Sequence, residues 1–559
     1  MFYFFDKQQP ETCQASAAFR AILTQLLLAC AAEKEILDIV QFAMGFGGLP
    51  DWDREPTATR DDILCLVRFI TQRLKRGTFI FDGVDECADP QDFFQCLREA
   101  TSSRQTIDPQ CPLPIGTLRP ITSKWIIDCK VVLFSRPDLR IPNNVLDQSS
   151  CIQLNPLQNS GDIRLFLHER LRGLVDDGLL MQQGRADTTI EAVSARSDGM
   201  FLWVRLLLDY LQCDALSYKD RTDALNNLVL FEGLDQLYHA ILQKLHQTLP
   251  AAGKRTVGRA FQWVAGAGRP LRIDEVAVAI TSTFNEAISE HNVIPNLEIA
   301  LTRISGSLLE LTSDRTVRFV HASVSEYLYG NPRSTFGFGL QRATTQSALG
   351  TLCLSYLYIC VPTGPLSGST DIAPSRQAIR SQFPLLEYCL GFWVQHCHNG
   401  TASDMPSSED YTHEALIRRM DDFLTSKAHV TTWIEASWLF GISPKLDLLV
   451  PALGYLLTSI PTHSNPQLVE KVIANLWLLS EDLKRLTKDW HAVLKVTPNE
   501  IWQPSISGFT SSDFWSNTQG ALWKRLDYAS PNEEKAIMIE SQVSEDSMEL
   551  ALIKVLVPR

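Results

Sequence analysis

The sequence predicts an α/β domain built on a parallel sheet, followed by a mainly α region. Over the first 155 residues, short continuously apolar runs alternate with segments of helical periodicity. This alternation is typical of doubly wound α/β domains. Beyond residue 156, helical patterns dominate. The chain has 559 residues, which is enough for roughly three or four domains.

The expected α/β domain spans residues 1–155. Four apolar runs are its candidate strands, and they read FYFF, TFIFD, KVVLFS and CIQL (residues 2–5, 78–82, 130–135 and 151–154). Because apolar and polar residues do not alternate in them, we expect both faces of each strand to be covered, as in a parallel sheet. Helical patterns at residues 16–32 and 60–77 separate the first two runs, and Gly77 ends the second pattern.

The segment from Thr101 to Lys124 interrupts this alternation. It contains four prolines and shows no apolar periodicity. A long segment without secondary structure is unusual inside a compact sheet. We interpret it as a surface insertion, and the alternative is sequence introduced by an imperfect gene model.

A helical domain is expected over residues 156–250, where Ser160 and Asp162 are candidate cap residues for its first helix. A winged-helix-like domain is expected over residues 251–335. Its pattern is a short helix in RPLRIDEVAVAIT, followed by strand, turn, strand and helix in LLELTSDRTVRFVHASVSEYLYG.

Two further regions complete the chain. Residues 340–530 carry helical patterns rich in Leu, Trp and Tyr, and residues 531–559 read as a short β-like segment with two strands around a polar turn. No repeat of fixed period is present, which argues against ankyrin or propeller arrays.

Composition narrows the class of protein. The net charge is −13 without a long run of either sign, which argues against broad nucleic-acid binding. Five apolar residues at the N-terminus are too few for a signal peptide, and no run reaches the length of about 18 apolar residues that suggests a membrane helix. The 13 cysteines form no CxxC pair and are expected to be reduced thiols. We therefore expect a cytoplasmic protein with no nucleic-acid and no membrane partner.

Carboxylates follow the second apolar run in TFIFDGVDEC, at Asp82, Asp85 and Glu86. A buried strand that ends in aspartate can hold Mg²⁺ through water, and a neighbouring carboxylate can orient the attacking water. The alternative is a strand that ends in a capped turn. Ser135 and Arg136 end the third run, at the sheet edge where open α/β sheets bind ligands.

The order of the motifs is more specific than any one of them. FYFF, FIFDGVDEC, VVLFSRPD, GMFLWVRL, RPLRIDEV and VRFVHASVSEYL follow one another along the chain. In this order the chain resembles the NACHT-type STAND proteins, which are signal-transducing P-loop NTPases. It is most similar to the nephrocystin-like N-terminal NACHT proteins of filamentous fungi. The resemblance covers residues 1–335, and FPLLEYCLGFWVQHC is similar to the helical region that often follows.

The resemblance implies roles for single residues. Asp82 would be the Walker B magnesium ligand, Asp85 and Glu86 the acidic pair after it, and Arg136 the sensor arginine. Ser135 and His321 would be on the nucleotide side, and His321 would be the winged-helix histidine that reaches a bound diphosphate in the inactive state. The alternative for His321 is a histidine packed at a strand–helix junction. Phe201 stands where many relatives carry a proline that contacts the nucleotide.

The resemblance also implies a Walker A loop, G-x-x-x-x-G-K-[ST], before the FYFF run. Only Met1 precedes that run, so we expect a truncated P-loop NTPase sheet with a vestigial site. The Gly253–Lys254 pair does not supply the loop, because Thr248 replaces the first glycine and Arg255 the serine or threonine. Backbone amides, a lysine and a hydroxyl are what hold the phosphates in such a loop.

Three functions follow as hypotheses. The first is a NACHT-type signalling or scaffold protein that binds no cofactor and is not an enzyme as given. The second is a nucleotide-switched, oligomerising NTPase that uses Mg-ATP or Mg-GTP, if an upstream P-loop exists. The third is a helical interaction scaffold that pairs with an intact NACHT partner through its exposed sheet. Each implies protein partners, in homo- or hetero-oligomers formed through NACHT domains.

Overall fold

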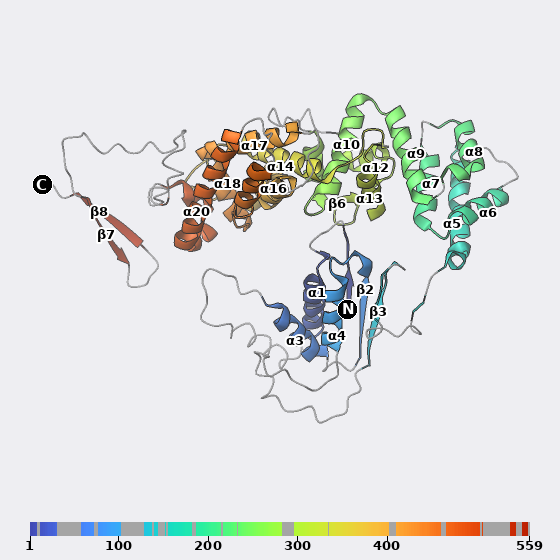
Figure 1. Cartoon of the computed structure of the whole chain (residues 1–559), viewed down its shortest axis with the longest axis horizontal. Helices are drawn as coiled ribbons and strands as arrows, with labels where there is room; N and C mark the ends of the chain where they lie inside the picture. The colour runs from blue at the N-terminus through green and yellow to red at the C-terminus, as the bar shows by residue number, and fades with distance from the viewer. Residues whose placement is uncertain are drawn as a thin grey trace, which may run out of the picture.

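The computed structural model describes residues 1–7, 12–30, 58–71, 76–101, 128–136, 139–142, 151–152, 155–180, 186–213, 216–231, 233–281, 294, 296–333, 335–401, 410–459, 466–503, 506, 537–543 and 550–556. Figure 1 shows a small α/β part next to a long row of helices. The expected insertion after Thr101 and the glycine-rich segment at residues 45–50 lie outside the described residues.

Three parallel strands form the N-terminal sheet, in the order β1-β2-β3: β1 (Phe2–Phe4), β2 (Arg76–Asp82) and β3 (Asp128–Leu133). They correspond to the first three apolar runs, so the predicted small parallel sheet is confirmed. The register pairs Phe4 with Asp82, so the carboxyl ends of β1 and β2 meet at one edge. The structure describes two residues of the fourth run, Cys151 and Ile152. Both have irregular backbone and are exposed, so this part of the run is not a strand.

Helices α1 (Ala15–Ala29), α3 (Arg60–Thr71) and α4 (Pro90–Thr101) accompany this sheet. The buried residues of α1 recur at spacings of three and four, so one face of the helix is apolar. Aromatic rings join the helices to the sheet, with Phe93 in contact with both Phe5 and Phe81. Gly77 lies within β2, where it pairs with Cys129 of β3, so it does not end a helix as expected.

The opposite face of the sheet carries exposed apolar side chains. Phe2 and Phe4 are 56% and 57% exposed, and Phe134 just after β3 is half exposed. Large rings are normally buried, so the α/β domain covers one face of its sheet and leaves the other largely bare within the described residues.

The next part consists of helices α5 (Pro156–Asp176), α6 (Ala186–Arg196), α7 (Phe201–Leu211), α8 (Tyr218–Asn226), the 3-10 turn η5 (Leu228–Phe231) and α9 (Gly233–Thr248). The first helix begins earlier than expected from Ser160 and Asp162. Asn155 is the cap, and it forms a reciprocal capping box with Gln158 while Pro156 occupies the first turn. Asn155 followed by Pro156 is a stronger start signal than Ser160 or Asp162, because the cap and the first-turn proline act together.

The winged-helix part consists of α10 (Ala251–Gly266), β4 (Leu271–Arg272), α11 (Ile273–Thr281), α12 (Leu297–Ile304), β5 (Leu309–Leu311), β6 (Thr316–Phe319) and α13 (Ala322–Gly330). Its strands are antiparallel, in the order β4-β6-β5. The Gly253–Lys254 pair lies in the first turn of α10, so it is part of a helix and does not form a phosphate-binding loop after a strand.

The C-terminal helical region consists of α14 (Arg342–Ile359), α15 (Arg376–Gln382), α16 (Leu386–Thr401), α17 (Asp410–Thr425), α18 (Lys427–Phe440), α19 (Leu449–Ser459), α20 (Pro466–Val496) and the 3-10 turn η7 (Pro498–Trp502). Strands β7 (Ile537–Val543) and β8 (Leu550–Leu556) pair antiparallel after it. In the part of the chain that the structure describes, no helix combines the length and apolarity of a membrane span.

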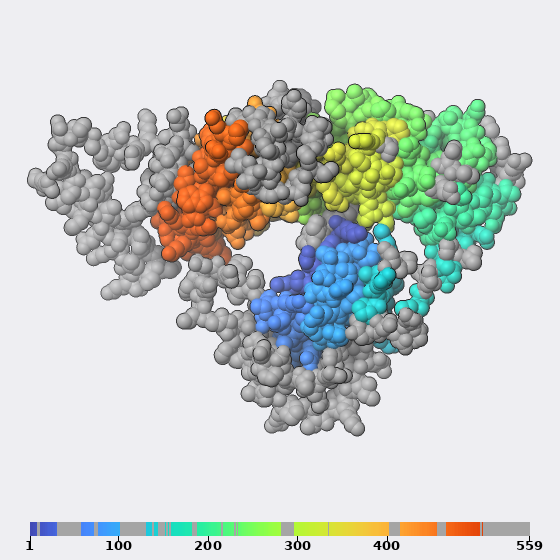
Figure 2. Space-filling model, viewed as in Figure 1, coloured from blue at the N-terminus to red at the C-terminus, as the bar shows by residue number. Residues whose placement is uncertain are grey.

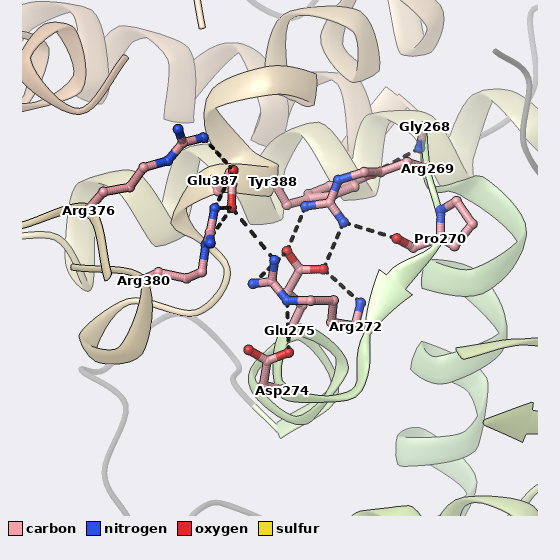
Figure 3. A network of polar contacts seen from close by, with 10 residues as sticks. All are labelled: Gly268, Arg269, Pro270, Arg272, Asp274, Glu275, Arg376, Arg380, Glu387 and Tyr388. Atoms are coloured by element: carbon pink, nitrogen blue, oxygen red, sulfur yellow. Dashed lines mark hydrogen bonds and ion pairs between the residues drawn. The ribbon is translucent and has the colours of Figure 1, made fainter. Parts of the chain in front are cut away.

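An ion-pair network joins the winged-helix part to the C-terminal helical region (Figure 3). Glu275 of α11 is fully buried and accepts two hydrogen bonds from the Arg269 guanidinium, at 2.7 and 2.8 Å. Arg272 lies 3.4 Å from Glu275 and 3.6 Å from Glu387 of α16. Glu387 is held in turn by Arg380 at 2.8 Å. Arg272 of the winged-helix part therefore connects the buried Glu275 to Glu387 of the C-terminal helical region.

A hydrogen-bond chain runs beside this network. The Gln346 amide donates through Nε2 to the Gly266 carbonyl, at 2.9 Å, so its Oε1 accepts from His396 Nδ1, at 2.6 Å. His396 Nε2 then accepts from the Tyr388 hydroxyl, at 2.7 Å, and the Tyr388 oxygen accepts from Gly268 N–H, at 3.1 Å. Burial lowers the pKa of His396 to about 4, which agrees with a neutral ring. The chain fixes the end of α10 on α14 and α16.

Candidate functional site

The turn after β2 places the predicted carboxylates. Gly83 has φ +69°, and a Cβ there would lie 2.8 Å from the Phe5 carbonyl oxygen, so glycine is required. The 3-10 turn η2 (Val84–Glu86) follows, and its Val84 side chain is buried. Asp85 and Glu86 are therefore directed to the carboxyl edge of the sheet, beside Asp82.

Arg136 interacts with Asp85. Its backbone N–H donates to Asp85 Oδ1 at 3.0 Å, and its guanidinium Nε lies 3.5 Å from Asp85 Oδ2. The structure therefore brings the predicted sensor arginine to the predicted acidic pair, and they neutralise each other. Ser135 remains exposed, and its hydroxyl donates to the Arg136 carbonyl at 3.2 Å.

Glu86 is also engaged. Its Oε2 accepts a hydrogen bond from the backbone N–H of Lys7, at 2.8 Å, which links the end of β2 to the segment after β1. Asp82 is exposed at the mouth of the site. The described residues contain no group of three or more His, Cys, Asp or Glu side chains arranged to hold a metal. Asp85 and Glu86 already have protein partners, the Arg136 side chain and backbone and the Lys7 backbone respectively.

His321 is the N-cap of α13. Its Nδ1 accepts from Ser323 N–H at 3.1 Å and lies 2.7 Å from the Ser323 hydroxyl. Burial lowers the pKa of His321, and Arg136 lowers it further, whereas Glu86 and Glu326 oppose this shift. The histidine therefore lies at the junction of β6 and α13, and the charges of the sheet edge act on its ring.

A cavity of about 700 Å³ lies between the two parts. Asp82 and Glu86 line it from the sheet edge, and His321 lines it from the winged-helix part. Ligand sites of this size are common in proteins. The structure thus brings the candidate residues from the two distant segments to one space, which the sequence could suggest only through the resemblance.

Lys7 and Glu326, which no sequence motif indicated, complete the contact between the α/β part and the winged-helix part. Glu326 of α13 lies 3.4 Å from Lys7 Nζ and 4.0 Å from Arg136 Nη1. All three side chains are 42–47% exposed. We call this the Glu326 latch. Lys7 directly follows the first apolar run and Glu326 lies in VRFVHASVSEYL, but no local pattern relates them. In Figure 2 the α/β part meets the helices over a narrow area on the face shown.

Two known protein families match separate segments of the chain. Residues 1–110 match the family model described as Nephrocystin 3, N-terminal, and residues 245–339 match the model described as GPI inositol-deacylase, winged helix domain. These matches support a NACHT-related family. No curated protein and no solved structure matches the chain. The first match contains the three helices and the first two strands of the α/β domain, the second contains the winged-helix part, and these two parts meet at the cavity.

Proposed function

We propose that this chain is a NACHT-type signalling or scaffold protein, in which the former nucleotide edge of the sheet serves as a reversible dock for the winged helix. One observation carries the proposal. Asp82 and Glu86 of the carboxyl edge face His321 across one cavity, and the Glu326 latch connects Lys7 and Arg136 to the winged helix.

The pairing of the edge residues favours docking over catalysis. Asp85 is neutralised by Arg136, and Glu86 holds the Lys7 backbone. A triphosphate at this edge would lie beside carboxylates, and the arginine there is already paired with Asp85. Positive charge for the phosphates would have to come from a phosphate-binding loop. We therefore propose that the given chain binds ATP and GTP only weakly and does not hydrolyse them.

The latch is weak enough to be reversible. Half-exposed ion pairs contribute about 0–1 kcal/mol each, because water and salt screen them. Charged partners, ionic strength or a bound anion can therefore open the contact. Reversible contact between the two parts is what a signalling scaffold requires.

The first experiment reverses the charge of the latch. In the E326K variant of the full chain, Lys7 and Arg136 meet a like charge, so we expect the α/β part to separate from the winged helix. Small-angle X-ray scattering should show a larger radius of gyration, and residues 1–7 and 321–330 should exchange amide hydrogen faster. The double variant E326K/K7E, which leaves Arg136 paired with Asp85, should move both values back toward those of the wild type.

The control is E298K, which reverses the charge of another exposed winged-helix glutamate, the partner of Arg315. An equal expansion in E298K, or none in E326K, would contradict the dock. Calorimetry with Mg-ATP and Mg-GTP tests the other half of the proposal. Micromolar binding by this chain would favour the nucleotide-switched alternative, in which Asp82, Arg136 and His321 contact the nucleotide.

A second candidate function rests on the bare sheet face. Phe2, Phe4 and Phe134 are about half exposed, and exposed apolar patches mark protein interfaces. We infer that a protein partner related to the NACHT family covers this face, so that the chain acts as a scaffold. The F4E variant should lose co-purification with such a partner, whereas L28E, on an exposed residue of α1, should retain it.

A further inference from the structure

A carboxyl group lies fully buried inside the C-terminal helical region. It is more than 100 positions along the chain from His321, which lines the cavity described above. Glu435 of α18 has 0% exposure. Its Oε2 accepts two hydrogen bonds, from Leu366 N–H at 3.0 Å and from the Trp502 indole N–H at 2.7 Å. Its Oε1 is buried and has no hydrogen-bond partner among the described residues.

Glu435 joins three segments. Leu366 belongs to the loop before α15, Glu435 to α18 and Trp502 to η7. A further bond closes the group, because Asn499 of η7 donates to the Thr370 carbonyl at 2.8 Å. Trp502 is itself buried. These bonds, together with the buried side chains of Ile501 and Trp502, attach η7 and the end of the long helix α20 to the region.

The charge on this group is disfavoured by its surroundings. A buried carboxylate without a cation or a full set of donors is costly, so burial favours the neutral form. Burial raises the pKa of Glu435 to about 7, and the bonds from Trp502 and Leu366 oppose the rise only in part.

Other ionisable side chains lie on the elements packed against α18. They include Cys353 on α14, His396 on α16, Asp421 on α17, Asp482 on α20 and Glu500 on η7, besides Lys427 and His429 on α18 itself. None of them contributes to the pKa shift of Glu435, which burial and the two N–H donors account for. The proton on Glu435 is thus controlled by whether the three segments stay closed.

We propose that Glu435 is a proton-binding switch: with its proton bound, η7 stays docked on α18, and proton loss favours release of η7 into water. The orphan Oε1 gives the physical reason, because a carboxylate gains water donors only when the segments open. The open group has the usual pKa of about 4.3. The equilibrium for opening therefore rises about tenfold per pH unit between that value and neutrality, and levels off above it.

The test uses the full chain labelled with ¹⁵N in its tryptophan indoles, and a W502F variant assigns the Trp502 resonance. In the wild type we expect this resonance to shift with a midpoint near pH 7. Amide exchange at residues 498–502, corrected for the intrinsic pH effect, should increase over the range from pH 5 to pH 7. In E435Q, the resonance shift and the extra exchange should both disappear, since the amide keeps the Oε2-type acceptor but cannot titrate.

The matched control is E500Q, on the same turn, which should titrate like the wild type. A Trp502 resonance that does not move between pH 5 and pH 8.5 in the wild type would overturn the proposal. Wild-type amide exchange at residues 498–502 that does not increase from pH 5 to pH 7 would overturn it without the use of any variant. A titration that persists in E435Q would overturn it as well.

Discussion

The winged-helix part has two junctions, and they are built in opposite ways. Its junction with the α/β domain consists of the half-exposed Glu326 latch, with contacts of 3.4 and 4.0 Å. Its junction with the C-terminal helical region contains a fully buried carboxylate, a bidentate arginine and a continuous hydrogen-bond chain. Carboxylates paired with basic side chains give a reversible contact at the junction with the α/β domain and a fixed contact at the junction with the C-terminal helical region.

Burial explains the difference. Ion pairs in water lose most of their attraction to screening, whereas a buried pair is costly to break because it leaves an uncompensated charge behind. We expect motion at the α/β junction and little at the other. The predictions below test this contrast, in order of decreasing effect.

The largest effect is expected for E275A. Removal of the buried carboxylate leaves Arg269 and Arg272 without their shared partner, and loss of one member of a buried pair costs about 3–5 kcal/mol. Chemical denaturation should show this loss in the free energy of unfolding. The exposed pair supplies the comparison, because E298A should cost less than about 1 kcal/mol. Equal losses in both variants would show that burial does not decide how much such an ion pair contributes.

The second effect is acid weakening of the fixed junction. The pKa of His396 is lowered by burial to about 4, so folding favours the neutral ring. This contribution is complete above the usual histidine pKa of about 6.5 and is lost as the pH falls toward 4. Each pKa unit corresponds to about 1.4 kcal/mol, so the loss is of the order of 3 kcal/mol. Glu435 acts in the opposite direction over part of this range, so the difference between wild type and H396N isolates the histidine. The same slope in both proteins would refute the assignment.

A smaller loss is expected for Y388F. The ring and its packing remain, but Gly268 N–H and His396 Nε2 lose their common partner. An unsatisfied buried polar group costs about 1–3 kcal/mol. Amide exchange at residues 264–270 should rise in this variant. Y358F provides the control, because Tyr358 stacks on His429 outside the hydrogen-bond chain, and it should leave that segment unchanged.

The smallest effect on stability is expected for E326Q. Loss of the latch charge should change the free energy of unfolding by less than about 1 kcal/mol. The distance between the α/β part and the winged helix should nevertheless become less dependent on salt. Scattering at low and high ionic strength measures this, and a salt response equal to that of the wild type would show that the latch does not hold the two parts together.

The sequence predicted the small parallel sheet and the two strands and helix of the winged-helix part, because apolar periodicity and turn residues act over a few positions. It also placed Asp82 at a strand end and His321 at the start of a helix. Local reasoning was wrong at Gly77, which pairs within β2, and at Ser160, because Asn155 with Pro156 begins the helix earlier. At Gly77 the secondary structure depends on pairing with Cys129 of β3, which lies far along the chain. At the start of α5 it depends on Asn155 and Pro156.

By itself, then, the sequence indicated which segments form the parallel strands and the winged-helix elements, since those patterns depend on neighbours in the chain. Only the tertiary structure decided which of them meet. Glu326 reaches Lys7 across 319 positions, and Tyr388 reaches Gly268 across 120. It also decided that Glu275 and Glu435 are buried while Glu326 stays half exposed. Burial depends on every element packed around a side chain, and it sets whether a glutamate forms a latch, a fixed joint or a proton switch.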